Sequence, residues 1–125
     1  MKYNTSGTVQ WAQSGGGPDY DVANGIAVDG SGNVYITGSF HSDKATFGST
    51  TLTNTISSDA MFIAKYNISG ILQWAKGVTG SSQGYGIVTN AAGTRVYTVG
   101  TYTPNAKFGN TILTTGQYLL WMYGE

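Results

Sequence analysis

Residues 64–75 have the sequence AKYNISGILQWA, which closely repeats the first twelve residues of the chain, MKYNTSGTVQWA. Eight of the twelve positions are identical, so Trp11 recurs as Trp74. Further matches follow in the same order at a spacing of 61 or 62 residues: Gly25-Ile26 with Gly86-Ile87, Val34-Tyr35 with Val96-Tyr97, Gly38 with Gly100, and Phe47-Gly48 with Phe108-Gly109. Because the ordered matches share one spacing, the chain consists of two copies of a unit of about 62 residues.

Each unit contains short apolar runs rich in β-branched and aromatic residues, bounded by Gly, Ser, Asn and Asp. This pattern is typical of strands joined by tight turns. In the first unit we expect strands at 25–29, 34–40, 60–66 and 71–76, and a small extra hairpin within 45–53. Their counterparts in the second unit are expected at 85–89, 95–102 and 117–123, with the hairpin at 106–114. Nothing indicates a helix, so the sequence predicts an all-β protein.

Two of the expected strands contain continuous apolar runs, MFIA at 61–64 and LLWM at 119–122. Such runs are typical of strands that are covered on both faces. Each unit is thus expected to form a sheet of four short antiparallel strands, and the sheets are expected to stack face to face. This arrangement indicates the blades of a β-propeller. We therefore expect two four-stranded blades per chain.

The segments 21–40, DVANGIAVDGSGNVYITGSF, and 61–75, MFIAKYNISGILQWA, resemble the bacterial SBBP-type β-propeller repeat. The second unit departs from this pattern at 89–94, TNAAGT. The resemblance implies a propeller fold and carries over no catalytic residues. It also implies an extracellular or cell-surface location, because such repeats are typical of secreted or surface-attached proteins. The N-terminal residues contain no apolar core of a signal peptide.

The order of the strands predicts self-assembly. Residues 1–14 supply an outer strand, 15–77 form a first blade, and 78–125 form a second blade that lacks its outer strand. Propellers have about four to eight blades, so we expect several copies to close a ring head to tail, each lending its N-terminal strand to a neighbour. A homotrimer is slightly favoured over a homotetramer. The alternative is that the chain is a piece of a longer propeller.

Strand exchange would place the assembly interface on alternate residues of the exchanged strand and of the last expected strand. These candidate interface residues are Val9, Trp11, Tyr118, Leu120 and Met122. Trp11 and Trp74 hold equivalent positions in outer strands, where aromatic side chains mostly fill the space between blades.

The composition excludes several classes of function. The 125 residues carry zero net charge and no block of like charges, which disfavours nucleic-acid binding. No apolar run is long enough to cross a membrane. Without cysteine, and with one histidine, the chain offers no disulfide, thiolate nucleophile or Cys-type zinc site, and we expect no cofactor. The sequence DGSGN at 29–33 resembles the start of a calcium loop, but its counterpart NAAGT has lost the ligands, which favours a hairpin turn.

One loop is a candidate ligand site. Asp19, Tyr20 and Asp21 follow a glycine-rich segment, in a loop expected at one face of the ring. We expect a noncatalytic scaffold or interaction module whose loops contact a protein or a glycan. The alternatives are a lectin-like glycan-binding propeller and, with less support, a hydrolase or lyase that gathers Asp19, Asp21 and Asp43 from several copies around the channel. His41 is expected to be a plain surface histidine.

Overall fold

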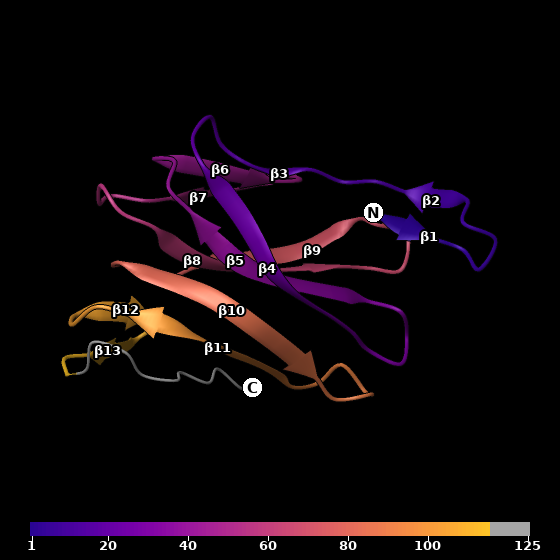
Figure 1. Cartoon of the computed structure of the whole chain (residues 1–125). Helices are drawn as coiled ribbons and strands as arrows, with labels where there is room; N and C mark the ends of the chain where they lie inside the picture. The colour runs from indigo at the N-terminus through magenta and orange to yellow at the C-terminus, as the bar shows by residue number, and fades with distance from the viewer. Residues whose placement is uncertain (116–125) are drawn as a thin grey trace.

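The computed structural model describes residues 1–115, and its regular elements there are all strands (Figure 1). The predicted all-β class is confirmed. The antiparallel four-stranded sheet of the first unit has the order β4-β5-β8-β9. Its strands are β4 (Asp21–Val28), β5 (Val34–Phe40), β8 (Ala60–Tyr66) and β9 (Leu72–Gly77).

The first strand of this sheet begins four residues earlier than the sequence predicts. Asp21 pairs with Phe40, so β4 follows β5 along its whole length, with a bulge at Asn24. The bulge disrupts the apolar alternation that would have revealed the strand. The strand predicted at 25–29 is therefore too short at its N-terminal end.

The extra hairpin of the first unit is present as β6 (Lys44–Phe47) and β7 (Thr50–Thr53), with the short β3 (Gly15–Gly16) added at the edge. The hairpin covers the first blade, because the rings of Phe47 and Phe62 lie 4.6 Å apart. The cluster beneath it consists of Phe40, Ala45, Phe47, Ala60, Phe62, Ala64, Tyr66 and Ala75.

The second unit repeats this plan as far as the structure describes it. It contains β10 (Ser82–Thr89), β11 (Val96–Tyr102), and a hairpin of β12 (Ala106–Phe108) and β13 (Thr111–Leu113). The expected strand at 117–123 lies outside the described residues. Figure 1 shows β10 lying across the first sheet. The cluster between the two units consists of Tyr35, Met61, Ile63, Val78, Ile87, Val96, Tyr102, Ala106 and Phe108.

The N-terminal strands β1 (Lys2–Tyr3) and β2 (Val9–Trp11) pair with each other and belong to neither large sheet. They lie beside the turn between β8 and β9, where the indole Nε1 of Trp11 donates a hydrogen bond to the carbonyl of Ile68 at 2.9 Å. This position, next to the first blade but outside its sheet, is the one expected for the outer part of a preceding blade.

Candidate functional site

The contact between the two units defines the two faces of a blade. Ile87 on β10 is buried against the first unit, with 7% of its surface exposed. Its counterpart in the first unit, Ile26, is 66% exposed. The two residues occupy the same place in the repeat, and they differ in exposure because the first unit packs against Ile87, whereas no described unit packs against Ile26.

A groove of about 650 Å³ runs over this uncovered face of the first blade. It separates β4 from the N-terminal hairpin and is open to solvent. Its lining includes Trp11, Val22, Ile26, Val28, Phe62 and Tyr66. We call this surface the open groove.

The second unit has an uncovered face on its opposite side. Along β11, Val96, Thr98 and Gly100 are buried toward the first unit, whereas Tyr97 and Val99 remain partly exposed. On β10, Tyr85 and Val88 are exposed. Alternate side chains of a strand point to opposite faces, so Tyr97 and Val99 point away from the first unit, as does Val88, which pairs with Tyr97. Together with Tyr85, which lies at the bulge of β10, these residues form the open face of the second unit.

The two described candidate interface residues lie on the N-terminal hairpin. Val9 is half exposed, and Trp11 packs on the β8–β9 turn. The other three, Tyr118, Leu120 and Met122, lie outside the described residues. The assignment of all five to an assembly interface stays a prediction.

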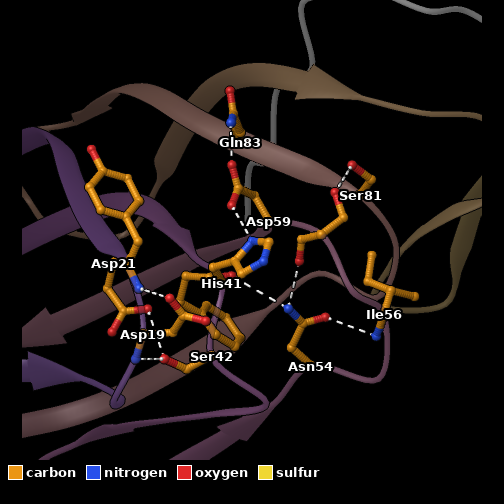
Figure 2. A network of polar contacts seen from close by, with 12 residues as sticks. Asp19, Asp21, His41, Ser42, Asn54, Ile56, Asp59, Ser81 and Gln83 are labelled. Carbon is orange, nitrogen blue, oxygen red and sulfur yellow. Dashed lines mark hydrogen bonds and ion pairs between the residues drawn. The ribbon is translucent and has the colours of Figure 1, made fainter.

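The candidate ligand loop uses its carboxylates to hold its own backbone, as Figure 2 shows in part. The Asp21 carboxylate accepts hydrogen bonds from the amide of Gly17 at 2.6 Å and from the hydroxyl of Ser42 at 3.4 Å. The Asp19 carboxylate accepts one from the amide of Tyr20 at 2.8 Å, and the Asp19 amide donates to Ser42. Tyr20 is 70% exposed, and of the three loop residues its side chain is the most available to a partner.

A second polar group joins the two units at the same place (Figure 2). Nδ1 of His41 lies 3.0 Å from Oδ1 of Asp59, and the side-chain amide of Gln83 on β10 donates to Oδ2 of Asp59. Next to them the hydroxyls of Ser58 and Ser81 are 2.8 Å apart. His41 lies at the surface as the sequence predicts, with 41% of its side chain exposed, and it is in addition paired with Asp59.

Sequence reasoning missed this junction because His41 and Asp59 are far apart in the chain. The signal was present in the strand register. Phe40 pairs with Ala60 at the end of β5 and β8, so the residues that flank this pair, His41 and Asp59, must be neighbours.

The turn between β4 and β5 has the form of a tight hairpin. Oδ1 of Asp29 accepts hydrogen bonds from the amides of Ser31 and Asn33, and Gly32 has a φ of 80°. Oδ2 accepts from the side chains of Asn33 and Tyr35. Burial raises the pKa of the Asp29 carboxyl, but these hydrogen bonds outweigh it, so the pKa lies below its ordinary value.

No group of three or more His, Cys, Asp or Glu side chains among residues 1–115 is arranged to hold a metal ion. The same residues include no helix of the length and apolarity needed to cross a membrane. The donors around Asp29 are N–H and O–H groups, and their hydrogen bonds occupy the carboxylate. Asp29 thus acts as a turn residue.

Comparison with known proteins supports the fold. No curated protein matches the chain. The family model described as the SBBP beta-propeller repeat matches residues 10–39, which run from within β2 through the loop that contains Asp19 to Asp21 and through β4 to the penultimate residue of β5. These residues run from the outer strand of one predicted blade to the inner strands of the next. A segment of the chain, residues 10–39, is thus similar to the SBBP beta-propeller repeat, and it lies within an all-β structure of antiparallel sheets.

Proposed function

We propose that this chain is a noncatalytic β-propeller module that closes a ring with further copies of itself. The exposure of Ile26 beside the burial of its counterpart Ile87 carries this proposal. In each unit, the face that carries this isoleucine is suited to be covered by another unit. Within one chain, only the isoleucine-bearing face of the second unit is covered. The open face of the second unit repeats the face that the first unit presents to β10, so a second copy is the matching occupant of the open groove.

Two glycines support exchange of the outer strand. A Cβ atom on Gly48 would lie 2.9 Å from Cβ of Leu72 on the outer strand β9. The counterpart of Gly48 is Gly109, and a Cβ atom there would meet no atom of residues 1–115 within 4 Å. The repeat places Val9 of another copy where Leu72 stands in the first unit. The N-terminal strand of that copy would therefore pack over Gly109.

The noncatalytic part of the proposal rests on how the carboxylates are used. Asp21 holds its loop, Asp29 holds a turn, and Asp59 joins the two units. Each carboxylate accepts hydrogen bonds from groups of the chain itself, and the pair of Asp59 with His41 lies at the junction of the two units. This arrangement favours a structural role over acid–base catalysis.

Measurement of absolute mass by light scattering over a dilution series tests self-assembly. We expect a mass of three or four times the 13.1 kDa of one chain, with dissociation on dilution. Three copies would give a ring of six blades, which we favour slightly over eight. A folded monomer at every concentration would overturn the proposal, and a series of masses without a limit would replace the closed ring by an open filament.

A second candidate function is glycan binding at the loop of Asp19, Tyr20 and Asp21. The exposed ring of Tyr20 favours it, because aromatic side chains with polar neighbours provide a surface on which a sugar ring can stack. A glycan array probed with the assembled protein tests this candidate. Absence of any bound glycan would remove it and leave the assembling module unaffected.

A further inference from the structure

The two copies of the sequence KYNxSG form the same turn. Oδ1 of Asn67 accepts hydrogen bonds from the amides of residues 69 and 71 at 3.0 and 2.9 Å. Oδ1 of Asn4 accepts from the amides of residues 6 and 8 at 3.0 and 2.9 Å. The glycines agree as well, with φ of 79° at Gly70 and 78° at Gly7. The backbones of the two turns are therefore interchangeable.

The turn that contains Gly70 forms a docking site for a tryptophan side chain, which we call the seat. The indole of Trp11 lies on this glycine, since an added Cβ atom would be only 2.6 Å from Cδ2 of the ring. The same indole donates its Nε1 hydrogen to the carbonyl of Ile68 at 2.9 Å. A side chain at position 70 would push the ring away, so the seat requires glycine.

The turn that contains Gly7 offers the same seat, and no described residue occupies it. A Cβ atom on Gly7 would meet no atom of the described part of the chain within 4 Å. The tryptophan that corresponds to Trp11 is Trp74, which rests edge-on against Tyr35 with ring centroids 6.3 Å apart. Within residues 1–115 the Nε1 of Trp74 has no hydrogen-bond partner.

Trp74 and the vacant seat of the same chain lie on opposite sides of the first blade. Trp11 lines the open groove, whereas Trp74 lines a separate cavity beside the second unit, with Val78 and Phe108. A tryptophan on this side therefore needs a turn from another molecule. The repeat supplies one when the N-terminal hairpin of a second copy completes the second unit.

We propose that Trp74 of one copy docks on the turn at residues 4–8 of the next copy, stacking on Gly7 and donating its Nε1 hydrogen to the carbonyl of Thr5. The occupant of this site is a second copy of the chain. The inference rests on the proposed function, and it names a specific contact that would hold each exchanged strand in place. Buried aromatic anchors of this kind dominate the free energy of protein interfaces.

Gly7→Asn tests the seat, because asparagine tolerates a positive φ and yet adds a Cβ atom where the indole would lie. We expect the monomer to keep its unfolding midpoint and the dissociation constant of the assembly to rise about tenfold or more, as overpacking of a close contact does. Ser6→Ala, in the same turn, is the matched control and should leave the dissociation constant unchanged. An unchanged constant for Gly7→Asn would overturn the inference.

A double-mutant cycle separates direct contact from a general weakening. Trp74→Ala should raise the dissociation constant by itself and should leave room for the added Cβ atom, so that Gly7→Asn has little further effect in that background. If the double variant raised the dissociation constant by the product of the two single effects, Trp74 and Gly7 would not be in contact. That result would overturn this inference and leave the proposed ring unaffected. A parent protein that is monomeric at every concentration would instead overturn the proposed function and this contact with it.

Discussion

The hydroxyl of Tyr35 donates a hydrogen bond to the carboxylate of Asp29 at 3.0 Å, and both side chains are almost completely buried. The contact lies where the turn of the first blade meets the turn of the second unit. The amide of Gly30 donates to the carbonyl of Ala91 at 2.8 Å, and the Tyr35 hydroxyl is also 3.3 Å from the carbonyl of Gly93. Asp29 therefore stabilises the turn and the packing of the two units together.

Asp29→Asn should destabilise the chain at neutral pH. The amide has one acceptor atom in place of two charged oxygens, while the carboxylate now takes four hydrogen bonds. Loss of a charge-assisted bond costs about 1.5–3 kcal/mol. We expect the free energy of unfolding, measured by urea denaturation, to fall by about that amount. Asp43→Asn, at an exposed position, is the matched control and should have little effect.

The contribution of Asp29 should depend on pH in a defined direction. Its pKa is lower in the folded chain than in the unfolded chain, so ionisation stabilises the fold above the unfolded pKa of about 3.9. This stability is lost as the pH falls through the lower, folded pKa. The difference between the parent and Asp29→Asn should be full at pH 6 and should shrink below about pH 4. A difference that stays constant down to pH 2 would contradict the argument.

Asp59→Ala should loosen the junction between the two units. Asp59 contacts His41 of the first unit and Gln83 of the second, and its side chain is partly exposed. Loss of these contacts should lower the free energy of unfolding by about 1 kcal/mol. Gln83→Ala should add little to this loss, because both substitutions break the same contact. Fully additive effects in urea denaturation would show that the two residues act separately.

Most strands could be predicted from the sequence because their apolar side chains are unbroken. The expected bounds of β5 and β8 agree with the structure, since both strands are buried on both faces and contain few polar residues. The start of β4 was missed because the bulge at Asn24 hides the alternation. The periodicity of apolar residues indicates which side chains are buried. Prediction from this periodicity fails where a bulge shifts the side chains of a strand to the opposite face.

The polar contacts of the candidate site were less accessible to sequence reasoning. The repeat suggested that DGSGN at 29–33 is a turn, but not that Asp29 also meets Tyr35. The pair of His41 and Asp59 depends on the register of two strands far apart in the chain. The repeat itself was the better guide, because differences between equivalent residues, such as the exposures of Ile26 and Ile87, support the proposed contact between copies.

Tyr20→Ala should separate glycan binding from a plain loop. Its exposed ring is free to stack on a sugar, whereas Asp21 supports the loop through Gly17. If the loop binds a glycan, this substitution should abolish binding on an array while the assembly mass and the unfolding midpoint stay unchanged. Ile112→Ala, which removes another exposed side chain away from the exchanged strand, is the matched control. Equal binding by both variants would exclude the loop.

Ile26→Asp should dissociate the ring without unfolding the chain. Ile26 is 66% exposed in the single chain, so a carboxylate there remains hydrated and the fold is retained. In the ring the same position would be covered by another copy, as Ile87 is covered by the first unit, and a buried unpaired charge is strongly unfavourable.

The matched control is Ile112→Asp. Ile112 is 54% exposed on the β12–β13 hairpin, and its counterpart Thr51 is exposed in the first unit as well. Light scattering at a concentration where the parent is assembled should give the mass of one chain for Ile26→Asp and the parent mass for Ile112→Asp. Circular dichroism should show the same β-sheet signal for all three proteins. An Ile26→Asp variant that keeps the parent mass would show that the open groove faces solvent, and the ring would then have to be built from other surfaces.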